Sequence, residues 1–241
     1  MSMTRLRRST AVRAVAQRSE TAQDVAFRWL KQHIMTLPRH EGTFLTESEV
    51  CEAIGSSRTP VREALLRLEA DGFLQIVPKK GAYVPPITEA EVEAVLQARG
   101  LVEDWCVRQA VRLSESLAAE LERLVSMQRD LQHTPVAFIE RDREFHRTIV
   151  LAAGNPVLAS FYESLRDRQL RMGWHAIAAS KERPDNVLAE HAAIVEAVRS
   201  GDPDRAAAAV AQHLSKTLVA LRLPIVTNLG RSQANLRKGG R

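Results

Sequence analysis

The chain has 241 residues and a formal net charge of +5; it is 45% hydrophobic and 26% charged. This length allows one large domain or two ordinary ones, with the composition of a soluble globular protein. Its two cysteines, Cys51 and Cys106, suggest neither a disulfide framework nor a cysteine-based zinc site, which favours a reducing, cytoplasmic location. We expect no membrane partner, because no apolar run is long enough to span a bilayer and the basic N-terminus lacks the apolar core of a secretory signal.

The positive charge is concentrated at the two ends of the chain. Residues 1–20 hold five arginines and one glutamate, and residues 226–241 hold four basic side chains and no acid, so each end carries +4. We expect 1–20 to be a flexible basic arm and 226–241 a flexible basic tail. Residues 21–85 contain eight basic and eight acidic side chains, and residues 86–225 carry −3. Bulk charge therefore does not establish a nucleic-acid partner, and the local arrangement of residues has to decide.

Residues 21–85 have the element order of a winged helix-turn-helix domain. Apolar residues at helical spacing predict a helix over 22–35. Thr46 and Glu49 form a capping-box pattern that begins a short second helix, ended by Gly55. A third helix is expected over 58–70, with Ser57 as its N-cap. Strands over 73–77 and 82–84, joined by a Pro-Lys-Lys-Gly turn, would complete the wing.

The predicted third helix presents cations in its first turn. Arg58, Thr59 and Arg62 would project from that turn. The apolar side chains expected to pack inward are Val61, Leu65, Leu66 and Leu68. Such a helix suits the DNA major groove, where arginine binds guanine or clamps phosphate. For an isolated helix the alternative is a surface helix with solvated arginines, but the neighbouring helix and wing favour DNA.

The nine-residue run Ser-Arg-Thr-Pro-Val-Arg-Glu-Ala-Leu at 57–65, followed by Gly72, Gly81 and Val84, resembles the DNA-binding domain of the GntR family of bacterial regulators. The loop at 37–45 departs from the usual Gly-x-Leu-x-Pro-Gly turn of that family. Lys80, at the wing tip, suits a phosphate or the minor groove. For Gly81 the resemblance implies close backbone approach to DNA, and a simple turn requirement is the alternative.

The Pro85-Pro86 pair divides the chain, and residues 86–225 have an almost wholly helical pattern. We expect helices at about 88–112, 114–132, 135–152, 156–179, 185–200 and 202–222, because each break supplies an N-cap or a proline. About six helices with short connections predict an antiparallel bundle with its own core. The fold class is therefore mainly α, a winged helix-turn-helix followed by an all-α bundle.

Three histidines and one aspartate of this bundle are spaced for a metal site. Asp142 and His146 lie four residues apart, so they share a helix face. His191 and His213 lie about ten residues before and after the turn at 201–203, which sets them side by side on antiparallel helices. This donor set suits a divalent metal, with Zn, Ni, Mn and Fe equally acceptable. The alternative is a surface Asp142–His146 pair beside core histidines.

Residues 88–222 resemble the helical ligand-binding domain of the FadR subgroup of GntR regulators, through the segments 142–146, 153–156, 190–194, 201–202 and 211–213. The resemblance implies that the aspartate and three histidines bind a metal that also receives a small carboxylate or sugar-acid effector. It places Arg99 as an effector contact, with a pair to Glu103 as the alternative. Arg171 and Trp174 are candidates for lining the same cavity, and Trp174 is otherwise a core residue.

These observations favour a transcription regulator, most commonly a repressor, that binds a palindromic operator as a homodimer and responds to an effector. One alternative is a bundle metalloenzyme with an accessory DNA module, in which Glu144 or Glu190 acts as the base. Glu144 would lie about 200° round the helix from Asp142, which disfavours catalysis, so we do not expect an enzyme. A purely structural metal in a ligand-free bundle is the third interpretation.

Overall fold

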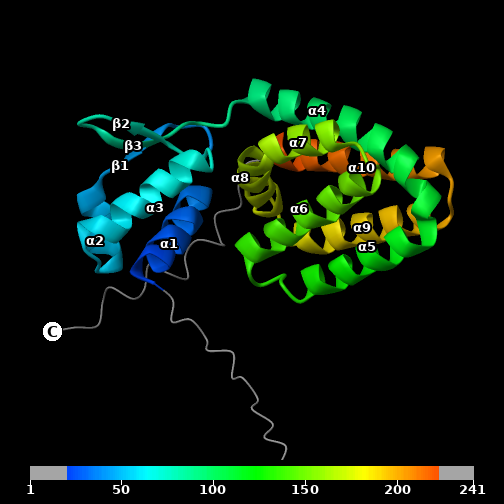
Figure 1. The fold of residues 1–241 in the computed structure, drawn as a ribbon, viewed down its shortest axis with the longest axis horizontal. Helices are drawn as coiled ribbons and strands as arrows, with labels where there is room; N and C mark the ends of the chain where they lie inside the picture. The colour runs from blue at the N-terminus through cyan, green and yellow to red at the C-terminus, as the bar shows by residue number, and fades with distance from the viewer. Residues whose placement is uncertain (1–20, 223–241) are drawn as a thin grey trace, which may run out of the picture.

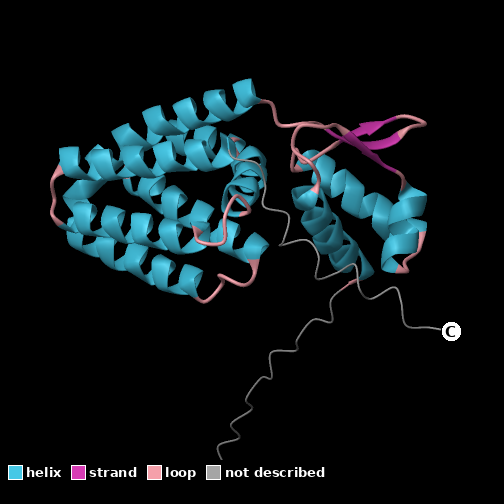
Figure 2. Ribbon diagram, turned by 180° about the vertical axis from the view of Figure 1, so that it is seen from behind, coloured by secondary structure: helices cyan, strands magenta, loops and turns pink. Residues whose placement is uncertain are grey.

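The structure is a computed structural model that describes residues 21–222, arranged as a winged-helix domain and a helical bundle joined by a short linker (Figure 1). The expected arm at 1–20 and tail at 226–241 lie outside the described residues. Figure 2 shows that the strands belong to the smaller, N-terminal domain and that the other domain is helical. Among the described residues, no helix combines the length and apolarity that crossing a membrane requires.

The N-terminal domain confirms the predicted winged helix. Its helices are α1 (Ala22–Thr36), α2 (Glu47–Ile54) and α3 (Arg58–Ala70), and its strands are β1 (Thr43–Leu45), β2 (Gln75–Val77) and β3 (Gly81–Val84). The strands form an antiparallel sheet in the order β1-β3-β2. Strand β1 was not predicted, because its three residues are defined by pairing with β3 rather than by a pattern of their own.

The capping residues of this domain are largely as predicted. Thr46 and Glu49 make the complete capping box of α2, and Gly55 ends that helix in the left-handed region at φ 66°. Ser57 occupies the N-cap of α3, but its hydroxyl caps no backbone amide. Leu66 is 51% exposed, so the expectation that it packs inward is wrong. It follows Arg62 by one helical turn and therefore lies on the arginine-bearing face.

The bundle runs from α4 to α10 and contains seven α-helices within the described residues. They are α4 (Glu89–Ala110), α5 (Ser114–Arg129), α6 (Pro135–Ala152), α7 (Pro156–Ser164), α8 (Arg166–Ile177), α9 (Arg183–Arg199) and α10 (Pro203–Arg222), with a short 3-10 turn at Val111–Leu113. Most of their inward apolar side chains belong to a hydrophobic core that also includes residues of the winged-helix domain.

The single helix expected over 156–179 is in fact two helices, α7 and α8. The break lies at Leu165, whose amide donates to the Tyr162 carbonyl three residues back, and neither glycine nor proline causes it. Tyr162 is buried in a small apolar cluster beside α4 and α6, whereas Leu170 and Met172 of α8 pack in the main core. Tertiary packing therefore divides a segment whose local sequence allows one continuous helix.

The two domains are tied together at their junction by polar contacts. The Ile87 amide donates to the Arg39 carbonyl at 2.6 Å, and the Arg39 guanidinium pairs with Glu89 at 2.7 Å. Lys31 of α1 pairs with Glu140 of α6 at 2.5 Å. Helix α8 is the bundle helix nearest the winged-helix domain in Figure 1, and it contacts α1 directly. Displacement of α8 would therefore change its contacts with the winged-helix domain.

Candidate metal centre and DNA-reading helix

The three residues predicted to read DNA lie together on the exposed N-terminal part of α3. Arg58, Thr59 and Arg62 are all exposed. Both fork nitrogens of Arg62 donate to the Glu47 carboxylate of α2, at 2.9 and 3.1 Å, and this bond lowers the pKa of Glu47. Arg58 has no ion pair or hydrogen bond within the described residues, so its guanidinium is available to another partner. No local pattern in the sequence indicates that Glu47 orients Arg62.

The wing tip carries Lys79 and Lys80, both exposed. Lys79 adopts a left-handed φ of 66°, which lets the three-residue connection between β2 and β3 reverse the chain. Gly81 has φ 108°, and a Cβ added there would lie 2.6 Å from the Leu45 carbonyl oxygen. The position needs glycine for both reasons, which supports the turn requirement as the explanation for Gly81.

The four predicted metal ligands converge from three helices. Asp142 and His146 come from α6, His191 from α9 and His213 from α10, and their candidate ligand atoms lie within 4.8 Å of one another. The Nε2 atoms of His146 and His213 are 3.1 Å apart, and His191 Nε2 is 3.3 Å from Asp142 Oδ1. Two ligands that each lie about 2.1 Å from one ion are at most about 4.2 Å apart, so the pairs at 3.1 and 3.3 Å fit a single metal ion.

Two histidines of the cluster are hydrogen-bonded through their other ring nitrogen, and the third lies beside a carboxylate. His191 Nδ1 is 2.8 Å from Gln128 Oε1, and His213 Nδ1 is 2.8 Å from Glu190 Oε2. His146 Nδ1 lies 2.8 Å from Glu103 Oε2. An oxygen acceptor at Nδ1 places the proton there and leaves Nε2 free to bind a metal. Gln128 and Glu190 therefore orient the imidazoles of His191 and His213, whereas Glu103 lies at ion-pair distance from His146 without hydrogen-bond geometry.

Burial keeps His191 and His213 in the neutral form that a metal needs. It lowers the pKa of His191 well below its usual range, and the charges of His213 and His146 lower it further. Burial also lowers the pKa of His213, although the bond to Glu190 opposes this. The Nε2 atom of His191 is buried and has no hydrogen-bond partner. A divalent metal would bind this neutral imidazole through its unpaired nitrogen. Without a metal, the nitrogen is a buried polar atom with no partner, which is energetically costly.

A small cavity adjoins this cluster, and the structure brings Arg99 to it. The cavity has a volume of about 30 Å³, and its lining includes Arg99, Asp142, Arg183 and His213. Arg99 is buried and donates from Nε to Glu103 at 2.7 Å, so the pair weighed as an alternative is present at the cavity wall. The volume admits one or two waters and is too small for a metabolite without expansion.

Arg171 and Trp174 do not line this cavity. Arg171 donates to the Pro85 carbonyl at 2.9 Å and lines a different cavity, at the junction of the two domains. Trp174 is partly buried against the main core and meets the His175 ring edge-on. Met172, Gly173 and Ala176 of the same helix do line the small cavity, so Arg171 and Trp174 miss it because they lie on other faces of α8.

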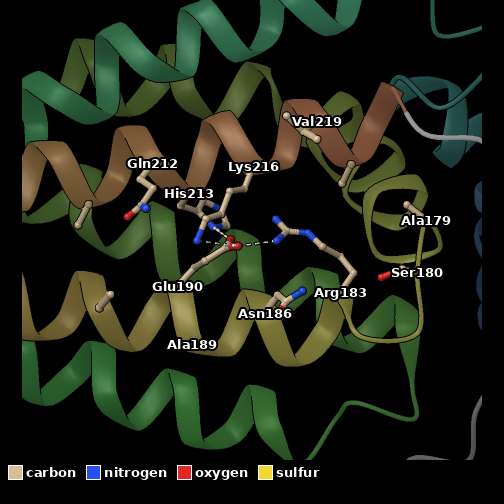
Figure 3. Close-up of a pocket in the computed structure, with 13 residues that line it drawn as sticks. Ala179, Ser180, Arg183, Asn186, Ala189, Glu190, Gln212, His213, Lys216 and Val219 are labelled. Carbon is tan, nitrogen blue, oxygen red and sulfur yellow. Dashed lines mark hydrogen bonds and ion pairs between the residues drawn. The ribbon is translucent and has the colours of Figure 1, made fainter.

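A larger groove of about 490 Å³ lies between α9 and α10, on the outer side of the cluster. Figure 3 shows Glu190 between Arg183 and His213, and all three residues line this groove. Glu190 accepts from Arg183 at 2.6 Å, and burial, which raises its pKa, is outweighed by the bonds from His213 and Arg183, which lower it. Arg183 and His213 line both the groove and the inner cavity, so they form the wall between them.

The sequence identified the four candidate ligands but not the residues that support them. These are Glu103, Gln128, Arg183 and, as a holder of His213 rather than a base, Glu190. Each acts across a helix–helix contact, so no fixed spacing in the sequence reveals it. The helix positions of Glu103 and Gln128 provide a weak signal, because both are polar residues within otherwise apolar faces.

An exposed arginine-bearing helix beside a basic wing, joined to an all-helical second domain, defines the class of DNA-binding transcription regulators. Residues 22–84 match the family described as bacterial regulatory proteins, gntR family, and residues 94–216 match the FCD domain. The chain therefore belongs to the GntR family and carries an FCD domain, as predicted.

Named relatives agree with this assignment. The chain is similar to the HTH-type transcriptional repressor RspR of Escherichia coli K12, with 30% identity over 202 residues, 81% of this chain and 87% of RspR. It is 28% identical over 181 residues to a probable D-xylose utilization operon transcriptional repressor of Paenarthrobacter nicotinovorans, covering 74% of this chain and 79% of that protein. The structure of E. coli McbR/YncC shares the fold, with a TM-score of 0.61, 24% identity, and coverage of 83% of this chain and 97% of McbR/YncC.

The contact between Glu190 and His213 yields a test of the metal centre. We expect Glu190→Gln to weaken Zn²⁺ binding by about 10- to 100-fold, because the neutral amide is a poorer acceptor for His213 Nδ1–H. Competition with a chromogenic chelator measures the affinity. The matched control is Glu196→Gln on the same helix, where the carboxylate is exposed and pairs with Arg199 outside the cluster. Equal Zn²⁺ affinities for the two variants would contradict this role of Glu190.

Proposed function

We propose that this transcription regulator binds a palindromic operator as a homodimer, and that a small carboxylate or sugar acid bound beside a divalent metal controls the binding. The observation that carries the proposal is the convergence of three Nε2 atoms and one carboxylate at a cavity that also holds Arg99. Repression relieved by the effector is the mode we favour, in keeping with the repressors to which the chain is similar.

Asp142, His146, His191 and His213 would hold the metal, and the cavity lies beside them. A bound ion would supply a positive site for an anion, and two buried arginines of the cavity wall, Arg99 and Arg183, add positive charge. Arg99 binds Glu103 through Nε only, so this contact leaves the two terminal nitrogens of the guanidinium uncommitted. This charge distribution favours a carboxylate over a neutral sugar or an amine.

The small size of the cavity indicates how an effector would be sensed. A volume of about 30 Å³ must expand to admit even a small acid, and one wall is formed by Met172, Gly173, Ala176 and Ile177 of α8. This wall is tightly packed, since a Cβ added at Gly173 would lie 2.8 Å from Ile139 Cγ2 of α6. Entry of an effector would displace α8, which contacts α1 and the linker, and so would reposition the reading helices.

The contacts of the candidate bases favour sensing over catalysis. Glu190 is committed to Arg183 and His213, and Glu144 is paired with Arg141 on the outer face of α6. Neither carboxylate is placed as a free base beside the cluster. A purely structural metal is less consistent with the cavity, because such a site does not need a buried arginine next to it.

The reading helix is tested by operator binding. We expect Arg58→Ala to weaken specific binding to the protein's own upstream DNA by about 1–3 kcal/mol while nonspecific binding changes less. Gel shifts against specific and scrambled duplexes at two salt concentrations measure both. Arg112→Ala is the matched control, because Arg112 is an exposed arginine of the bundle. An equal loss on both duplexes would assign Arg58 to phosphate contact and reject base reading.

The effector response is tested with the metal ligands. We expect a small carboxylate from a screened set to lower operator affinity of the Zn²⁺-loaded protein by about 5- to 150-fold. His146→Ala, or prior chelation, should abolish this response and preserve operator binding. His133→Ala is the control, because His133 lies outside the cluster and on no helix of the bundle core. Fluorescence anisotropy provides the readout, and a response that survives both treatments would contradict a metal-dependent effector site.

A hydrophobic face on α4 and α7 is our candidate for the dimer surface. Leu101 and Trp105 on α4 are 77% and 42% exposed, and Val157 and Phe161 on α7 are 74% and 43% exposed. The two members of each pair are one helical turn apart, and α4 contacts α7. Large apolar side chains gathered in this way suit a self-complementary two-fold interface, which a palindromic operator also requires.

Sedimentation analysis tests this surface. We expect the double substitution Leu101→Asp with Phe161→Asp to shift the protein toward monomer and to lower operator affinity, because charge is buried at the interface. Val219→Asp is the control, since Val219 is 58% exposed but lines the α9–α10 groove instead. Monomer formation by the control alone would transfer the interface to that groove.

A further inference from the structure

A second cavity, separate from the metal cluster, lies where the two domains meet. Its volume is about 690 Å³, within the range of small-molecule sites, which often lie at domain interfaces. Gly72 and Gln75 of the winged-helix domain line one side, Pro85 and Pro86 of the linker line another, and α8 supplies Arg166, Arg168 and Arg171. None of the four candidate metal ligands lines it.

Arg171 is buried there without a carboxylate partner. Arg99 and Arg171 are equally buried, each 6% exposed, yet they differ in their charge compensation. For Arg99, burial opposes the charge but Glu103 outweighs it and raises the pKa, whereas for Arg171 burial prevails over the opposing charge of Glu91 and lowers the pKa. Arg171 donates to the neutral Pro85 carbonyl, and its Nε has no hydrogen-bond partner. A buried guanidinium in this condition is stabilised by an anion.

The charged side chains around the cavity do not supply a paired anion for Arg171. Arg168 pairs with Glu91 at 2.9 Å, and the other glutamate of the lining, Glu163, is bound by Arg143 and Arg147. Arg166 is exposed and makes no ion pair or hydrogen bond within the described residues. Asp71 is the remaining acid of the lining and pairs with neither Arg166 nor Arg171. Two arginines therefore face the cavity without carboxylate partners.

The same positive potential affects His175, which lies near the end of α8. Burial, together with the charges of Arg171, Arg39 and His40, lowers the pKa of His175 to about 4. Both ring nitrogens of His175 are buried without partners.

Helix α8 also begins at this cavity, and its N-cap residue, Leu165, has no side-chain acceptor for the first amides. Backbone amides and arginines at a helix start favour phosphate in particular.

We propose that the interdomain cavity is a binding site for a small phosphate monoester, held by Arg166 and Arg171 at the start of α8. A phosphate monoester carries a charge of about −1.5 to −2 at pH 7, which matches two unpaired arginines. Because Arg171 also donates to Pro85, the ligand would be bound against the linker that connects the DNA-reading domain to the bundle. This site is distinct from the proposed carboxylate site and does not depend on the metal.

Isothermal titration calorimetry on the full-length protein tests this proposal, with glycerol 3-phosphate as the probe and succinate as the dicarboxylate comparison. We expect saturable binding of glycerol 3-phosphate and weaker binding of succinate. Arg171→Gln and Arg166→Gln should each weaken phosphate binding about tenfold or more, since each removes a charged hydrogen-bond donor. Arg166 is exposed, so its variant tests the site even where Arg171→Gln impairs folding.

One further variant and one treatment establish whether the phosphate binds in this cavity. Arg205→Gln removes an exposed arginine of α10 outside the cavity lining and should leave binding unchanged. Treatment of the protein with EDTA should also leave phosphate binding unchanged, whereas it would abolish a response mediated by the metal centre. Binding that is absent, that survives both arginine substitutions, or that is lost on chelation would overturn the site. Succinate binding tighter than glycerol 3-phosphate would overturn the phosphate assignment.

Discussion

The geometry of the bundle depends on a buried carboxylate, Glu103 of α4. Its Oε1 accepts from Arg99 Nε at 2.7 Å and from the Tyr162 hydroxyl at 2.8 Å, and its Oε2 lies 2.8 Å from His146 Nδ1. Burial raises the pKa of this carboxyl, but the charges of Arg99 and His146 outweigh it and hold the pKa well below its usual range. One side chain thus connects α4, α6 and α7 and places a carboxylate beside one imidazole of the cluster.

A buried charge of this kind is informative because it is costly. Removing one partner of a buried pair typically destabilises a protein by about 3–5 kcal/mol, whereas an apolar replacement of the whole set is often tolerated. Tyr162 shows the same environment, since burial raises the pKa of its hydroxyl well above the usual range. The presence of a polar network in an otherwise apolar bundle is explained most simply by the need to hold a negative charge beside His146 and to keep Arg99 charged beside the cavity.

Much of the fold, and the four candidate ligands, could be predicted from local sequence. The capping box at Thr46 and Glu49, the i,i+4 pair at Asp142 and His146, and the turn at 201–203 act over a few residues, so the sequence contains the signal. Strand β1 and the break at Leu165 arise from pairing and packing with distant segments. Arg171 and Trp174 miss the cavity although α8 lines it, because the face that a helix turns toward a cavity is set by its packing against distant segments.

The net charge of zero on the winged-helix domain determines how strongly an effector must weaken DNA binding to release the protein from its operator. Its eight basic and eight acidic side chains give little general attraction for DNA, and Glu47 already occupies both fork nitrogens of Arg62. Arg62 must therefore exchange a carboxylate for a base or phosphate when it binds, so its net contribution is smaller than that of Arg58. Affinity of the described domain then rests on few contacts placed correctly. A coupling free energy of about 1–3 kcal/mol between effector binding and operator binding is therefore sufficient to release a domain of this kind from its operator. A strongly basic domain would stay bound after the same loss, because its general attraction to phosphate is larger.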